Sequence, residues 1–182
     1  MALLGRRGEG RHERREERRG GGGDVEVYQM REKLVSFGDD FWIETNGGRR
    51  AFKVDGKVAR IRDTLVIRDV SGNEVAKVQE RKVAIRDTIS IERPGKPNAT
   101  IKKALVNPLR ERFTLQADDI GEIDIQGNIV DHEYKFERGD AKIAEVSKRW
   151  LRLRDTYGVE ISSGEDIALI LAATVALDQM SH

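Results

Sequence analysis

The chain contains no cysteine, which excludes a disulfide framework and any metal site built on thiolates. It also lacks a run of the roughly 20 apolar residues that a helix needs to cross a bilayer. The first seven residues, MALLGRR, become charged too early for a secretory signal peptide. These absences predict a cytoplasmic protein without a transmembrane segment, whose contact with a membrane would be peripheral.

Histidine is scarce, with only His12, His132 and His182 in the whole chain. They fall near the N-terminus, in a predicted strand and at the C-terminus. No metal-ligand pair or nucleophile–base arrangement can be built from them. We therefore expect His132 to be a surface residue of its strand. We also expect no catalytic residue, no metal and no cofactor, and a protein that is not an enzyme.

An excess of charge of either sign is also missing, because 33 Lys and Arg balance 32 Asp and Glu. Residues 1–24 carry seven Arg against four Glu and one Asp, which leaves a net charge of −1 for the remainder. The remainder thus lacks the basic footprint of nucleic-acid-binding domains, and we expect no nucleic-acid partner. Residues 5–24 also lack apolar periodicity, which predicts a disordered, mixed-charge arm over residues 1–24.

What the chain does contain is a repeated phrase. Residues 59–67, 83–91 and 151–159 read ARIRDTLVI, VAIRDTISI and LRLRDTYGV, with the alternation of a half-buried strand. That alternation puts Asp63, Asp87 and Asp155 on the apolar face, where an ionised carboxylate needs partners. Either the tripeptide marks a bend whose carboxylate accepts freed backbone N–H groups, or the three carboxylates converge on a cation. We favour the bend, because three copies spread over a sheet need not meet.

From Val25 onward, short apolar runs alternate with turn signals such as Asn46-Gly47, Asp55-Gly56 and Gln126-Gly127-Asn128, which suit tight connections. The predicted strands lie near residues 27–35, 41–46, 49–54, 57–62, 64–69, 74–81, 83–92, 99–106, 111–117, 121–125, 129–136, 141–149 and 151–161. So many strands on short connections predict a closed antiparallel β-barrel of about twelve strands, because closure removes exposed edges.

The last segment has a different pattern. Residues 167–177, IALILAATVAL, are apolar on every side and rich in strong helix formers. Ser162 and Glu165 have capping-box spacing, which predicts a helix over about 164–180 with Ser162 as its N-cap. A helix without a polar face must be buried all round, most simply inside the barrel. The sequence thus predicts one mainly β domain over residues 25–182, whose barrel encloses a C-terminal helix.

Several of these stretches together resemble one known family. They are residues 28–34 (YQMREKL), 38–44 (GDDFWIE), 51–57 (AFKVDGK) and 69–78 (DVSGNEVAKV), with the Arg-Asp-Thr copies and the terminal helix. The set covers residues 27–180 and resembles the LURP-one-related family, which has the tubby C-terminal-like fold. The resemblance implies a barrel threaded by a hydrophobic helix. It also implies kinship with phospholipid scramblases and with tubby proteins, whose barrel binds phosphoinositide headgroups. It carries no lipid-binding residue onto this chain.

Two basic pairs occupy equivalent positions in the repeat, Arg81-Lys82 and Lys148-Arg149, and a third pair is Lys102-Lys103. If the equivalent bends share a rim, Arg81, Lys82, Lys148 and Arg149 would form an anion-binding cluster. The alternative is a solvated strand edge that is protected by charge against aggregation.

We therefore expect a non-catalytic binding or scaffold domain. One hypothesis is contact with anionic phospholipid headgroups through these four residues. The other is a protein–protein scaffold that touches no lipid, which the near-neutral charge of the domain favours. Scramblase-like or enzymatic activity ranks below both.

Overall fold

The computed structural model describes residues 24–31, 40–55, 64–83, 86–104, 111–148 and 156–180. The predicted arm over residues 1–24 lies outside this part except for Asp24. The predicted strand at 57–62 also lies outside it.

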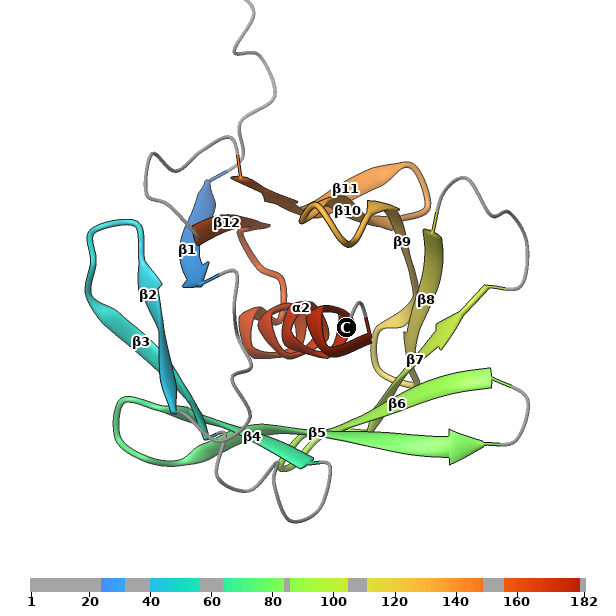
Figure 1. Cartoon of the computed structure of the whole chain (residues 1–182), viewed down its shortest axis with the longest axis horizontal. Coiled ribbons are helices and arrows are strands. Elements are labelled where there is room, and N and C mark those ends of the chain that lie inside the picture. The colour runs from blue at the N-terminus through green and yellow to red at the C-terminus, as the bar shows by residue number, and fades with distance from the viewer. Residues whose placement is uncertain are drawn as a thin grey trace, which may run out of the picture.

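Twelve strands and one helix make up the described part of the chain. They are β1 (Val25–Arg31), β2 (Phe41–Thr45), β3 (Arg50–Asp55), β4 (Thr64–Asp69), β5 (Glu74–Val83), β6 (Arg86–Glu92), β7 (Ala99–Lys103), β8 (Glu111–Ala117), β9 (Gly121–Asn128), β10 (Glu133–Arg138), β11 (Ala141–Ser147), β12 (Thr156–Ser162) and α2 (Ile167–Met180). Each strand pairs antiparallel with the next, and β1 pairs with β12, so that the sheet closes on itself (Figure 1). The predicted twelve-stranded barrel is confirmed.

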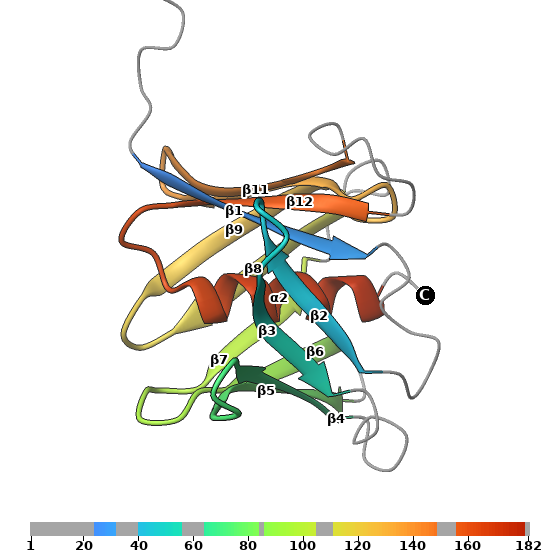
Figure 2. The same ribbon diagram turned by 90° about the vertical axis from the view of Figure 1, so that its left-hand side faces the viewer.

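Because the strands alternate in direction, successive connections lie at opposite ends of the barrel. At the end that we call the entry end lie the turns at residues 46–49, 70–73, 93–98, 118–120 and 139–140, together with residues 163–166, which lead into α2. At the opposite end, here the far end, β5, β7 and β11 finish and α2 also finishes (Figure 2). Every strand thus runs from one end to the other around the helix.

The helix fills the interior of the barrel, as predicted. Its residues from Leu169 to Leu177 are at most 1% exposed, and they pack in one apolar core with inward side chains from all around the sheet, such as Ile43 and Phe113. The buried hydroxyl of Thr174 donates to the carbonyl of Ile170 at 2.9 Å, which satisfies it within the helix. No helix in the described part is long and apolar enough to cross a membrane.

The start of the helix differs from the prediction. Helix α2 begins at Ile167, and its N-cap is Asp166, whose Oδ1 accepts the backbone N–H of Leu169 at 3.1 Å. Ser162 instead ends β12. The capping-box interpretation was wrong because the carboxylate of Glu165 pairs with the guanidinium of Arg138. Both Ser and Asp are good N-cap residues, so the spacing alone could not separate them.

The turn predicted at residues 126–128 is also wrong. Strand β9 continues to Asn128, and the turn follows at residues 129–132. Gly127 has a φ of 146°, and a Cβ there would lie 2.4 Å from the carbonyl oxygen of Glu133. This glycine therefore permits the close approach of β9 and β10 and does not make a turn.

The Arg-Asp-Thr copies mark the beginnings of strands. Thr64 begins β4, Arg86 begins β6 and Thr156 begins β12, all at the far end. The strand predicted near residues 83–92 is present as β6 but starts later, at Arg86, since Val83 still belongs to β5 and pairs with Arg86. Strands β1 to β3 separate β12 from β4, so these beginnings do not converge. The carboxylates of the three copies lie outside the described part, and their bonding stays a prediction.

The buried helix gives a direct test of the fold. We predict that Leu171→Asp abolishes folded, soluble protein, because an unpaired buried carboxylate costs several kcal/mol. The measurement is circular dichroism and thermal melting of the soluble fraction. The control is Val70→Asp, which makes the same kind of change at a side chain that is 65% exposed and should melt like the parent protein. A Leu171→Asp variant with unchanged melting would contradict burial of the helix.

Candidate functional site

The predicted basic residues lie at the far end of the barrel. Arg81 and Lys82 are near the end of β5, and Lys148 directly follows β11. Arg149 lies outside the described residues, as do the side chains of Arg81 and Lys82. Five strands separate β5 from β11 in either direction around the barrel. The end of β5, with Arg81 and Lys82, and Lys148 therefore lie at the same end of the barrel but on opposite sides of it, so these described residues do not form one cluster.

The strand register brings a different pair of basic residues beside Arg81. Thr88 on β6 lies opposite Arg81 on β5 and opposite Lys102 on β7. Since neighbouring strands are a little under 5 Å apart, the backbones of Arg81 and Lys102 are about 10 Å apart. Lys102 and Lys103 are both exposed. Arg81, Lys82, Lys102 and Lys103 are called the β5–β7 cluster below.

In the sequence, Lys102-Lys103 is only an isolated basic pair. Nothing in the linear pattern placed it beside Arg81, because that neighbourhood depends on how β5, β6 and β7 are aligned. The register of β6 with both of its neighbours supplies this information.

Charge is distributed unevenly around the wall. Strands β5 to β7 carry six Lys and Arg against four Asp and Glu, a net charge of +2; the other two cations of residues 74–103, Arg93 and Lys96, lie in the turn at residues 93–98. Residues 121–147, which form β9 to β11, carry three basic and seven acidic residues, a net charge of −4. The two walls lie on different sides of the barrel (Figure 1). The near-neutral total therefore conceals a basic wall and an acidic wall.

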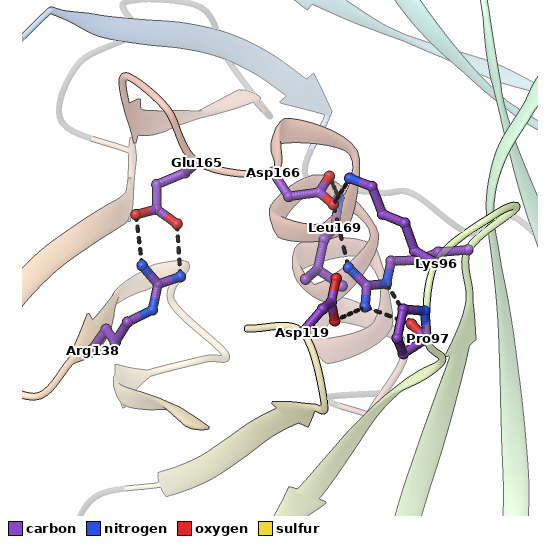
Figure 3. A network of polar contacts seen from close by, with 8 residues as sticks. Lys96, Pro97, Asp119, Arg138, Glu165, Asp166 and Leu169 are labelled. Atoms are coloured by element: carbon purple, nitrogen blue, oxygen red, sulfur yellow. Dashed lines mark hydrogen bonds and ion pairs between the residues drawn. The ribbon is translucent and has the colours of Figure 1, made fainter. Parts of the chain in front are cut away.

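A polar network holds the helix start at the entry end (Figure 3). The side chain of Arg93 is 3% exposed, and its guanidinium binds the carboxylates of Asp119 and Asp166 and the carbonyl of Pro97. The ammonium of Lys96 lies 2.7 Å from the same Asp166 carboxylate. Three separate segments thus meet at one buried cation, and they fix the position where α2 enters the lumen.

Two carboxylates, those of Asp166 and Glu165, hold the segment that leads into α2. Burial opposes ionisation of Asp166, but the hydrogen bonds from Lys96 and from the N–H of Leu169, with both nearby cations, outweigh it and hold its pKa below the ordinary 3.8. Its neighbour Glu165 forms a two-pronged pair with Arg138, at 2.9 and 2.8 Å. The segment before the helix is therefore tied to β10 and to the turn at residues 93–98.

A second buried polar cluster lies at the other end of the helix. His132 is 2% exposed and has a φ of 53° in the turn between β9 and β10, so the expected surface position is wrong. Its ring stacks on Tyr157 with centroids 4.3 Å apart. Its Nδ1 lies 3.3 Å from Oδ1 of Asp178, in the last turn of α2. The strand pattern missed this because His132 belongs to a turn that folds over the lumen.

The surroundings of His132 favour an anchoring role. The Asp178 carboxylate that faces His132 also acts on Tyr134: burial, and secondly the charge of Asp178, raise the pKa of Tyr134 above its usual range, so this phenol stays protonated. Asp178 and His132 together connect the last turn of the helix to the β9–β10 turn. Both side chains are almost fully enclosed. The arrangement suits positioning of the helix end better than contact with a substrate.

Neither cluster has the composition of a metal centre. Among the residues that the structure describes, no group of three or more His, Asp and Glu side chains is placed to hold a metal ion.

Comparison with known proteins identifies the family. The family model described as LURP-one-related matches residues 26–178, and the chain belongs to this family. A curated relative, the uncharacterized protein YxjI of Bacillus subtilis (strain 168), is 26% identical over 158 residues, which are 87% of this chain and 94% of the relative. An X-ray structure of an Arabidopsis thaliana protein matches with a TM-score of 0.61 and 18% identity, covering 87% of this chain and 92% of that one. The latter likeness supports the fold.

The entry network predicts a pH dependence. A carboxyl group whose pKa is lower in the folded state stabilises the fold above its ordinary pKa and loses this contribution as the pH falls through the folded value. Asp166→Asn keeps a good N-cap but removes the charge. We expect it to lower the free energy of unfolding by about 1–3 kcal/mol at pH 7, and the deficit to shrink below the ordinary value of 3.8.

Urea unfolding of both proteins at several pH values measures this difference. The control is Asp118→Asn at the exposed neighbour of Asp119, which should change stability little at any pH. A deficit for Asp166→Asn that stays constant from pH 7 to about pH 2, well below the ordinary carboxyl pKa, would refute the ionic part of the interpretation.

The His132 cluster predicts a loss of stability on truncation. His132→Ala removes the ring stacked on Tyr157 and one partner of the buried Asp178, so we expect unfolding to become easier by about 1–3 kcal/mol. Urea unfolding measures the change, and Lys135→Ala, at an exposed position on β10, is the control and should stay within about 0.5 kcal/mol. Equal stability of the two variants would show that His132 does not anchor the helix.

Proposed function

We propose that this LURP-one-related protein is a non-catalytic, cytoplasmic binding domain that contacts anionic phospholipid headgroups through the β5–β7 cluster. The observation that carries the proposal is the filled lumen. Ligand sites in β-barrels are commonly found in the cavity or at its mouth. Here helix α2 takes that space, with the side chains from Leu169 to Leu177 at most 1% exposed. Recognition is thereby left to the wall and the rims.

Charge supports an anionic ligand for one part of this surface. The strands from β5 to β7 carry a net charge of +2, and their far end holds the β5–β7 cluster, of which Lys102 and Lys103 are exposed. An anionic membrane would attract this wall and repel the acidic wall from β9 to β11. Attraction is worth about 1 kcal/mol for each basic residue near the surface. Four residues would therefore give weak, reversible and salt-sensitive binding with a defined orientation.

The second candidate is a protein scaffold that touches no lipid. The acidic wall of residues 121–147, with a net charge of −4, is the specific feature that favours it. Such a surface suits a basic protein partner, and complementary charge speeds association of this kind. The two candidates use different sides of the barrel, so substitutions in one wall distinguish them.

Vesicle flotation tests the lipid hypothesis. We expect the parent protein to float with vesicles rich in phosphatidylserine at low salt and not with neutral phosphatidylcholine vesicles. Substitution of the β5–β7 cluster by alanine should reduce the floated fraction about ten-fold or more, since four contacts of about 1 kcal/mol are lost. A separate double variant, Lys148→Ala with Arg149→Ala, measures the contribution of the opposite side of the rim.

A matched control removes the same charge elsewhere. It replaces four other basic residues of the entry end and the wall by alanine, namely Arg49, Arg50, Arg68 and Lys135. If this control binds as weakly as the cluster variant, the attraction comes from net charge and not from the cluster. If the parent protein shows no preference for anionic vesicles at low salt, the lipid hypothesis is lost and the scaffold remains.

A further inference from the structure

Among the described residues, the junction between β1 and β2 has less strand pairing than the junctions on either side of it. Strand β1 pairs with β12 along its whole length, from Val25 opposite Ser162 to Arg31 opposite Thr156. Within the described residues it pairs with β2 only where Tyr28 lies opposite Thr45 and Gln29 lies opposite Glu44. The line between β1 and β2 is called the seam below.

Strand β2 is firmly held on its other side. It pairs with β3 from Phe41, opposite Val54, to Glu44, opposite Arg50. The first three residues of β2 are therefore aligned with β3 but, in the described part, not with β1. Figure 2 shows the consequence, since β1 and β2 come together beside the middle of β1 and diverge toward the far end. Strand β1 is thus held mainly by β12 and strand β2 mainly by β3, and the two strands pair with each other over a short stretch.

Two further hydrogen bonds hold the seam, and both lie toward the entry end. The N–H of Asn46 donates to the carbonyl of Val27 at 2.9 Å, and the side-chain amide of Gln29 donates to the carbonyl of Asn46 at 3.2 Å. Separation of the described parts of β1 and β2 therefore breaks few backbone bonds. The least protected segments of a protein open locally at a small fraction of the free energy of global unfolding.

Apolar side chains lie directly behind the seam. Met30 on β1 is 1% exposed and Ile43 on β2 is 0% exposed, and both belong to the same apolar core as α2. We propose that the barrel opens laterally along the seam, by loss of the two β1–β2 pairs, and that this opening exposes the core side chains of Met30 and Ile43 to solvent. The opening needs no lipid or partner and is independent of the proposed function.

Because the chain has no cysteine, a single introduced thiol reports the opening. The variant is Ile43→Cys, and the matched control is Ile125→Cys on β9. Both isoleucines are 0% exposed. Ile125 lies opposite Phe113 on β8 and Phe136 on β10, whereas the register of Ile43 in the described part includes only Phe52 on β3. The two sites are thus equally buried, but Ile43 borders the seam and Ile125 lies between two paired strands.

We expect a thiol reagent to label Ile43→Cys about ten-fold or more faster than Ile125→Cys under native conditions, since local opening is cheaper than global unfolding. Urea unfolding of each variant corrects the rates for any difference in global stability. Equal corrected rates would overturn the proposal, because both thiols would then be reached by the same unfolding event.

A second experiment avoids substitution in the core. In the double variant Gln29→Cys with Glu44→Cys, the two cysteines face each other across the seam, at a separation that a disulfide can bridge. Oxidation should slow hydrogen exchange in residues 41–45 about ten-fold or more, as expected when a local opening is blocked. The control disulfide, Gln126→Cys with Lys135→Cys across β9 and β10, should leave that segment unchanged. Equal exchange in the oxidised and reduced seam variant would contradict lateral opening.

Discussion

Burial of an all-apolar helix is the interaction on which the rest of this structure depends. Side chains alone just fill a barrel of about eight strands, so a closed sheet of twelve strands leaves space that only a further element can occupy. Helix α2 is that element, and its residues from Leu169 to Leu177 fill the space. Barrel and helix therefore require each other, because the helix has no polar face to expose and the sheet has no other core.

This mutual requirement explains the two polar clusters. A uniformly apolar helix can rotate or slide without a large loss of burial, so its position must be fixed by directional bonds. Arg93 and Asp166 fix the start of the helix, and His132 and Asp178 fix its end. Such pairs inside a low-dielectric core add little net stability, but they disfavour alternative placements, which is the best-supported use of buried polar groups.

The architecture was readable from the sequence because it depends on patterns along the chain. The alternation of the strands and the apolar run at 167–177 are local features, and they predicted the twelve described strands and the helix, with shifted ends at β6, β12 and α2. The errors concern residues whose role depends on a distant neighbour. Gly127 looked like a turn signal because its partner, the carbonyl of Glu133, is seen only once β9 and β10 pair. Likewise, the approach of Lys102 to Arg81 requires the register of three strands.

The fold determines where a ligand can reach this barrel, and the residues of the surface determine which ligand it is. One fold hosts many functions. The filled barrel therefore indicates that a ligand binds outside the lumen, but it does not indicate which ligand. The far end combines three features with independent causes: the basic ends of β5 and β7, the end of the helix and the widening of the β1–β2 junction. The entry end, by contrast, is tied by the network around Arg93, which is 3% exposed. At the far end His132 and Asp178 hold the last turn of α2, so the helix is tied to the barrel wall at both of its ends and the core can form in only one arrangement around it.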